Sequence, residues 1–151
     1  MQCNRHVGRI TDWHKAQSGA ESYAPHEDPG VLSVREIFEY YKSQGVQTII
    51  MGASFRNTGQ IKALAGCDNL TISPELLEEL GVEQAQLQLS LSPGSNPAEQ
   101  ALPVSETQFR WDTSQDAAAH HLLADGIRKF DQDHAKMVAL VSAPQKHRPE
   151  A

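Results

Sequence analysis

Residues 48–61, TIIMGASFRNTGQI, join an apolar run to a helical pattern through a short polar loop. The β-branched residues within 46–51 predict a short strand, and Gly52 ends it. Residues 58–65 predict a helix after the loop. A strand that leads through a loop into a helix is the repeating unit of α/β proteins. This stretch therefore decides the fold class.

The same alternation of helix and strand continues on both sides of this stretch. Upstream, the capping box SVRE predicts a helix over residues 33–44, which ends at a glycine. Downstream, residues 69–72 predict a second strand, and a serine followed by a proline opens a predicted helix at 74–80. Helices that alternate with short apolar strands predict an α/β protein with parallel strands buried on both faces.

The C-terminal part of the chain has a different composition. Residues 82–104 are rich in Gln, Ser and Pro, which favours a linker or a poorly packed hairpin arm. A second capping box at 105–108 predicts a short helix, and Asp116 is predicted to cap a long one. Residues 143–151 are predicted to be a frayed tail. The long helix repeats one stripe every three or four residues: Leu123, Ile127, Phe130, His134, Met137 and Val141.

Composition narrows the class of protein. The 151 residues are 39% hydrophobic and 21% charged, which predicts one globular domain over 1–151. The net charge of −6 and the scattered basic residues argue against a nucleic-acid or membrane surface. No apolar run approaches the ~18 residues of a membrane-spanning helix, and no signal peptide opens the chain, so we expect a cytoplasmic protein. Neither the two cysteines nor the seven histidines have metal-ligand spacing, so we predict no metal and no cofactor.

Ser54 and Arg56 are the candidate functional residues of the opening stretch. They follow the carboxyl end of a predicted parallel strand, where α/β proteins bind ligands. A guanidinium offers a bidentate fork for phosphate, the hydroxyl adds a donor, and the next helix directs free N–H groups to the same place. An arginine in such a loop is as often a surface ion-pair partner. The pattern by itself leaves both interpretations open.

Two other candidates have weaker patterns. Residues 7–16, VGRITDWHKA, predict a helical segment with Arg9 near its start, where an arginine ordinarily faces solvent. His134 lies on the apolar stripe of the long helix, and a packed histidine is the favoured interpretation there.

Four stretches together resemble the carboxy-terminal part of transaldolase, of the type common in bacteria and eukaryotes. They are VGRITDWHKA (7–16), EDPGVLSVREIFEYYKSQG (27–45), TIIMGASFRNTGQIKALAGCDNLTISPELLEEL (48–80) and DGIRKF (125–130). The resemblance covers most of residues 7–138 and weakens across 82–104. It is most specific in MGASFRN and AGCDNLTISPELL.

The resemblance implies an incomplete parallel (β/α)8 TIM barrel, with its last two strands, their helices and a long C-terminal helix. Residues 46–51 would be the seventh strand and 69–72 the eighth. Such barrels often hold a substrate phosphate in the loops after these strands. By resemblance, Ser54 and Arg56 belong to the sugar-phosphate pocket, and Arg9 matches a second phosphate-binding arginine.

The resemblance also implies a reaction. Transaldolases, in the non-oxidative pentose phosphate pathway, move a dihydroxyacetone unit from sedoheptulose 7-phosphate to glyceraldehyde 3-phosphate through a Schiff base on a lysine. The family takes this lysine and its acidic partners from earlier strands. We therefore expect a chain that binds sugar phosphate, has no catalytic residue of its own and is inactive alone. Its lysines all fall in predicted helices or the tail: Lys15, Lys42, Lys62, Lys129, Lys136 and Lys146.

The start of the chain departs from the family pattern. Asn4, Arg5 and His6 stand where the family's sixth strand ends in a sequence like Ser-Pro-Phe. We therefore expect that strand to be missing, as in a truncated reading frame. Two parallel strands alone would leave unpaired edges. The alternative function is a non-catalytic interaction partner, which pairs its open edge with a second copy or with a chain that supplies the missing strands.

Overall fold

The structure is a computed structural model that describes residues 1–94 and 103–142. The chain divides into two compact units, Met1–Pro103 and Val104–Ala151. The predicted frayed tail, residues 143–151, lies outside the described residues, as do residues 95–102 of the predicted linker.

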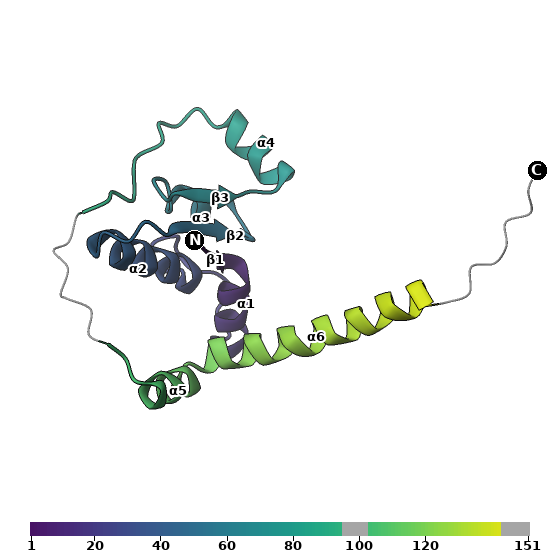
Figure 1. The fold of residues 1–151 in the computed structure, drawn as a ribbon. Coiled ribbons are helices and arrows are strands. Elements are labelled where there is room, and N and C mark those ends of the chain that lie inside the picture. Colours follow the sequence, from purple (N-terminus) through teal and green to yellow (C-terminus); the bar gives the residue numbers. More distant parts are fainter. Residues whose placement is uncertain (95–102, 143–151) are drawn as a thin grey trace, which may run out of the picture. The chain divides into compact units, whose positions relative to one another are not determined.

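The first unit is built on three parallel strands, β1 (Gln2–His6), β2 (Ile49–Ala53) and β3 (Asn69–Thr71), in the order β1-β2-β3 (Figure 1). The α/β class with a parallel sheet is confirmed. The expectation that no strand precedes residue 7 is wrong, because β1 pairs with β2 along its whole length. Its polar sequence, QCNRH, carries no apolar run that would predict a strand.

Four helices accompany these strands: α1 (Val7–Ser18), α2 (Pro29–Ser43), α3 (Thr58–Lys62) and α4 (Pro74–Val82). All four were predicted; the starts of α1, α3 and α4 are as predicted, and the other bounds differ. The helices α1 and α2 pack against each other; α2 also packs against β1 and β2, and α1 against β2. Because α1 follows β1 without a loop and α3 follows β2 after four residues, the first turns of both helices lie at the carboxyl ends of the strands.

The start of α2 lies one turn before the predicted capping box. Asp28 caps it, with its carboxylate accepting hydrogen bonds from the backbone N–H of Gly30 at 2.8 Å and of Val31 at 3.2 Å. Proline at the first helical position has a fixed φ suited to a helix start and lacks only an N–H that has no partner there. Ser33 is therefore inside the helix, and its hydroxyl accepts a hydrogen bond from Nη2 of Arg5 at 2.9 Å.

The sheet has one covered face and one open face. Ile50 of β2 is fully buried with Val31, Val34 and Phe38 of α2 and with Leu64. Burial of the strands on both faces was predicted, and among the described residues this is wrong. Side chains alternate along a strand, so the residues between the covered ones share the open face. They are mainly polar: Gln2, Asn4 and His6 of β1 and Asn69 and Thr71 of β3.

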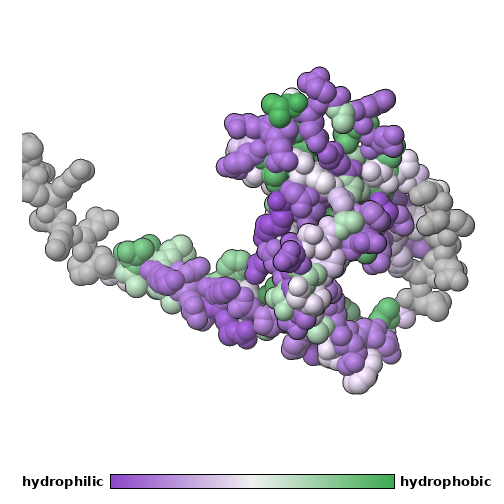
Figure 2. Space-filling model, turned by 180° about the vertical axis from the view of Figure 1, so that it is seen from behind, coloured by the Kyte–Doolittle hydropathy of each residue, from purple (hydrophilic) through white to green (hydrophobic). Residues whose placement is uncertain are grey.

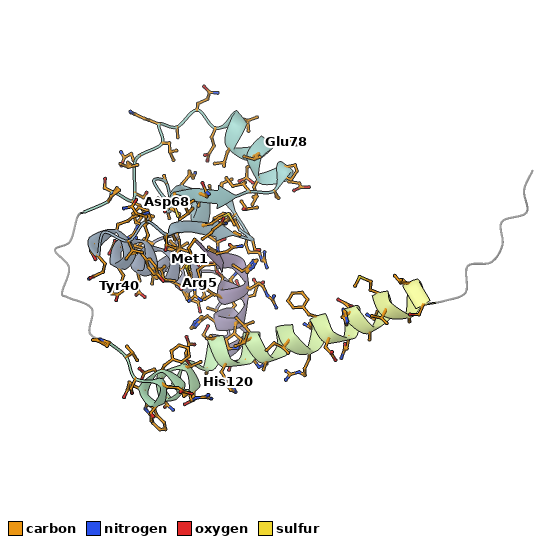
Figure 3. All side chains as sticks on the ribbon, viewed as in Figure 1. Met1, Arg5, Tyr40, Asp68, Glu78 and His120 are labelled. Atoms are coloured by element: carbon orange, nitrogen blue, oxygen red, sulfur yellow. The ribbon has the colours of Figure 1, made fainter. Side chains whose placement is uncertain are left out.

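The turn before β3 is fastened to the start of β2. Asp68, labelled in Figure 3, accepts a hydrogen bond from the backbone N–H of Ile50 and forms an ion pair with Lys42, both at 2.8 Å. The Cys67 thiol donates to the carbonyl of Ile50 at 3.3 Å. Burial raises the pKa of the Cys67 thiol, which favours the protonated form of the sulfur over the reactive thiolate. These contacts hold two strand ends in register.

The segment after α4 is neither strand nor free linker in its described part, residues 83–94. The backbone N–H groups of Ser90 and Leu91 both donate to the carbonyl of Ala65 at 2.9 Å. Leu91 is only 3% exposed and joins the core. The leucines at the alternate positions 87, 89 and 91 therefore do not form a hairpin arm, and Leu91 packs into the core instead.

The second unit contains α5 (Glu106–Gln115) and α6 (Ala117–Ser142). Both predicted caps are confirmed, since the Ser105 hydroxyl accepts from the N–H of Gln108 and the Asp116 carboxylate from that of Ala119. Apolar residues lie at the surface of α6 among hydrophilic ones (Figure 2). In the part of the chain that the structure describes, no helix has both the length and the apolar character to cross a membrane.

Candidate anion-binding site

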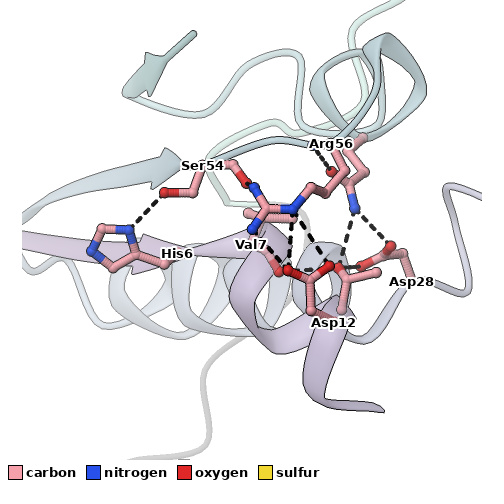
Figure 4. A network of polar contacts seen from close by, with 8 residues as sticks. His6, Val7, Asp12, Asp28, Ser54 and Arg56 are labelled. Atoms are coloured by element: carbon pink, nitrogen blue, oxygen red, sulfur yellow. Dashed lines mark hydrogen bonds and ion pairs between the residues drawn. The ribbon is translucent and has the colours of Figure 1, made fainter. Parts of the chain in front are cut away.

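Ser54 lies directly after β2 in a left-handed conformation, with φ of 60°. A residue with a Cβ rarely adopts this conformation, and such strain persists where surrounding contacts hold it. Its carbonyl accepts hydrogen bonds from the N–H of Gly8 at 3.1 Å and from Nη1 of Arg56 at 2.9 Å. Its hydroxyl lies 2.8 Å from Nδ1 of His6 (Figure 4). The loop after β2 is thereby tied to the end of β1 and the start of α1.

Gly8 makes this close approach possible. A Cβ at Gly8 would lie 2.7 Å from Cζ of Arg56 and would collide with the carbonyl oxygen of Ser54. Glycine allows the helix backbone and the guanidinium to share this space. The glycine in the motif VGR therefore has a steric role beside the loop that contains Arg56.

The Arg56 guanidinium forms a two-pronged ion pair with Asp12 of α1. Nη2 lies 2.8 Å and Nε 3.2 Å from the same carboxylate oxygen (Figure 4). The arginine and aspartate side chains are 43% and 53% exposed, respectively. Ion pairs this exposed contribute about 0–1 kcal/mol. An anion of higher charge can therefore compete with Asp12 for the guanidinium at little cost in stability.

A buried polar cluster positions the backbone of Arg56. Oε1 of Gln60 accepts from the Arg56 N–H at 2.7 Å, and its amide donates to the Asp28 carboxylate at 2.8 Å and to the Thr11 hydroxyl at 3.1 Å. Gln60 is 1% exposed. Thr11, Asp28 and Gln60 were not predicted as parts of this site. The proline after Asp28 was the available signal, because it marks a helix start whose cap carries a carboxylate.

Arg9 lies in the first turn of α1 and is exposed. Within residues 1–94 and 103–142, its side chain has no hydrogen bond or ion pair. It precedes Asp12 by three positions, and such residues are neighbours on a helix surface. Arg9 and Arg56 are thus both placed beside Asp12, at the carboxyl end of the sheet. The expectation that Arg9 lacks its preceding strand is wrong, because β1 leads straight into α1.

Other features of the described residues lie apart from this site. An open cleft of about 700 Å³ is lined by residues of α3, α4 and the segment that follows, and contains none of Arg9, Ser54 or Arg56. Within the described ranges, no three His, Cys, Asp or Glu side chains are placed to hold a metal ion. Five lysines are described, and all lie on helices and none on a strand: Lys15, Lys42, Lys62, Lys129 and Lys136.

Comparison with known proteins agrees with the resemblance drawn from the motifs. The family model described as Transaldolase/Fructose-6-phosphate aldolase matches residues 5–141. This chain belongs to the transaldolase family. It is 52% identical over 136 residues to the transaldolase of Photorhabdus laumondii, covering 90% of this chain and 43% of the relative.

Two further relatives show a similar identity and a similar coverage. The transaldolase of Shewanella sp. (strain W3-18-1) is 53% identical over 137 residues, and transaldolase A of Pasteurella multocida is 52% identical over 135. These matches cover 91% and 89% of this chain, and 43% of each relative. The chain therefore spans less than half the length of the curated transaldolases it matches.

Proposed function

We propose that this chain binds the phosphate group of a sugar phosphate, the substrate class of transaldolases, at the carboxyl end of β2. The observation that supports this most is the hydrogen bond from Nη1 of Arg56 to the carbonyl of Ser54 at the strand end. This contact holds the guanidinium at the strand end, in the same short loop that carries the Ser54 hydroxyl. A guanidinium fork and a hydroxyl are well suited to phosphate oxygens.

Arg9 contributes a second positive charge. Phosphate carries a charge near −2 at neutral pH, whereas the Asp12 carboxylate carries −1. With Arg9 and Arg56 both beside Asp12, the ligand exchanges one weak, exposed ion pair for interactions with two arginines. The affinity is set by this exchange.

We propose that the chain by itself does not form the Schiff base of the family reaction. A Schiff-base lysine needs a desolvated amine whose pKa is lowered by burial or by nearby charge. Lys42 and Lys62 are instead ion-paired with Asp68 and Glu83 on the helical side of the sheet. The sheet is, in this proposal, part of a (β/α)8 barrel whose catalytic groups lie on other strands.

Binding is tested by calorimetric titration of sedoheptulose 7-phosphate into the full chain. We expect Arg56→Ala to weaken binding at least about tenfold, the loss typical of one charge-assisted hydrogen-bond pair. The matched control is Arg110→Ala, which removes an equally ion-paired arginine from α5 and should leave binding unchanged. Equal affinity of Arg56→Ala and the unchanged chain contradicts the proposal.

The absence of catalysis is tested separately by borohydride reduction in the presence of the same sugar phosphate. We expect no covalent adduct. A lysine-linked adduct found by peptide mass spectrometry contradicts this part of the proposal and leaves the binding site standing.

The second candidate function is an interaction partner that completes its sheet with another chain. Two observations favour it: β1 and β3 are edge strands of the described sheet, and apolar side chains of α6 are exposed, such as Phe130 at 74%. Unpaired edges template strand addition. Co-expression with a chain carrying the earlier barrel strands tests it, since restored transaldolase turnover supports complementation. A co-purified but inactive pair counts against it.

A further inference from the structure

His6 is the last residue of β1 and lies beside the hydroxyl of Ser54. The two strands run parallel in register, with His6 opposite Ala53, so the residue after β2 meets the end of β1. Nδ1 of the imidazole lies 2.8 Å from Oγ of Ser54 (Figure 4). The ring stands on the open face of the sheet and is exposed. An imidazole is thus in direct contact with one of the two loop residues that we place on the phosphate.

The hydroxyl of Ser54 has one proton, and two acceptors compete for it. If Nδ1 of His6 carries no proton, Ser54 donates to the ring and has nothing to donate to an anion. If Nδ1 carries a proton, the ring donates to Oγ and the hydroxyl proton is free to turn outward. The ability of Ser54 to bind an anion therefore depends on the protonation of its neighbour.

We propose that His6 is a positioning residue of the phosphate site, which donates Nδ1–H to Ser54 and so directs the serine proton to a phosphate oxygen. This inference rests on the proposed function of Ser54 and Arg56. In the doubly protonated form, the ring adds a third positive charge beside those of Arg9 and Arg56. The bound state favours this form, since a dianion stabilises a nearby cation.

The charged groups around His6 act in opposite directions. Arg56 lies on the other side of Ser54, joined to its carbonyl and to Asp12, and Arg9 follows in the first turn of α1. Arg9 and Arg56 are cations, and Asp12 is an anion that pairs with Arg56. Arg5 points to the covered face of β1, where it donates to Ser33. A bound dianion adds two negative charges beside the ring, so the proton on the ring and the anion favour each other's binding.

Coupled binding gives the anion affinity a definite pH dependence. Because the doubly protonated ring accompanies the bound anion, affinity should fall as pH rises across the range in which histidines generally lose a proton, by up to about tenfold per pH unit for one linked proton. Phosphate esters themselves titrate near pH 6. Sulfate is the better probe, because its charge does not change between about pH 5 and about pH 8, the range in which histidine titrates.

The experiment is a sulfate titration of the full chain across this pH range, followed by calorimetry. His6→Phe should weaken binding about tenfold at the low end and abolish the pH dependence. His6→Asn keeps a neutral donor close to the place of Nδ1, and should restore most of the affinity without the pH slope. The control, His120→Asn, removes a histidine from α6 and should behave as the unchanged chain does.

The outcomes separate this inference from the proposed function. If Arg56→Ala abolishes sulfate binding and His6→Phe changes neither the affinity nor its pH slope, the role of His6 is overturned and the site stands. If the unchanged chain does not bind sulfate or sugar phosphate, both fall. Far-UV circular dichroism of each variant verifies the fold, and the ¹⁵N shift of Nδ1 should report a protonated nitrogen in the bound state.

Discussion

Gly8 and Arg56 donate hydrogen bonds to one and the same acceptor, the carbonyl oxygen of Ser54, at 3.1 and 2.9 Å. One donor is the backbone of α1, and the other is a side chain from the loop after β2. The shared oxygen joins two segments that are more than 40 residues apart in sequence. The candidate site is therefore one unit with the β1–α1 junction.

Gly8→Ala should disrupt this junction. The added methyl group would collide with the backbone carbonyl oxygen of Ser54, which has no room to move, and would displace the guanidinium of Arg56. We expect a loss of about 1–3 kcal/mol in the free energy of unfolding, measured by urea denaturation, together with weaker phosphate binding. Gly126→Ala is the control, since nothing lies near that position on α6. It should stabilise its helix by up to about 1 kcal/mol. An unchanged midpoint of urea denaturation for Gly8→Ala would contradict this prediction, because it would show that the β1–α1 junction can shift to accommodate the methyl group.

Gln60→Leu should be strongly destabilising although it conserves size. It leaves the Arg56 N–H and an Asp28 carboxylate oxygen without their partner in a buried setting. The expected cost is about 2–3 kcal/mol in the same urea experiment. Gln47→Leu alters an exposed glutamine that donates only to a nearby carbonyl, and its effect should stay within about 0.5 kcal/mol. Similar effects of the two variants would mean that the buried cluster does not hold the loop.

Asp12→Asn should separate binding from stability. The ion pair with Arg56 is half-exposed, so the free energy of unfolding should change by less than about 1 kcal/mol. Affinity for sugar phosphate should increase, because the guanidinium no longer has a competing carboxylate. Calorimetry measures this, and Glu106→Gln, which breaks the comparable pair with Arg110, serves as control. A fall in affinity would mean that Asp12 orients Arg56 more than it competes for it.

Cys67 should react slowly with iodoacetamide in the folded chain. Burial raises its pKa above the ordinary value of 9.0, so the thiolate fraction near neutral pH is smaller than in the unfolded chain. The unfolded state loses this proton at lower pH than the folded state. The contribution to stability is therefore complete below pH 9 and decreases as pH rises above it. Peptide mapping after alkylation, with and without urea, gives both rates, and equal rates would contradict the raised pKa.

The elements with a strong local signal could be predicted from the sequence, and β1 could not. The helices α4, α5 and α6 begin after capping residues that can be recognised in the sequence, such as Asp116 before α6. The residues of β1 are polar on one face and mixed on the other, and only pairing with β2 makes them a strand. The start of α2 shows the limit of local rules, because the helix begins at Asp28-Pro29 and not at the equally regular capping box at Ser33.

Two residues of the candidate site, Ser54 and Arg56, could be proposed from the sequence, but their contacts with other segments of the chain could not. Ser54 and Arg56 stand in a motif whose order indicates an anion site, and both now lie at the end of β2. Nothing in the sequence indicated that His6 contacts Ser54 or that Asp12 pairs with Arg56, because both contacts join segments more than 40 residues apart. Such contacts follow from strand register, which the sequence pattern did not reveal.

The backbone conformation of Ser54 has opposite consequences for the stability of the fold and for the proposed binding of phosphate. Glycine would adopt a φ of 60° without strain, so Ser54→Gly should raise the free energy of unfolding by roughly 1 kcal/mol. The same change removes the hydroxyl that we propose binds the phosphate. A variant with a higher melting temperature and a weaker affinity for phosphate would show that the chain tolerates a strained residue at this turn because the hydroxyl oxygen of Ser54 is needed for binding.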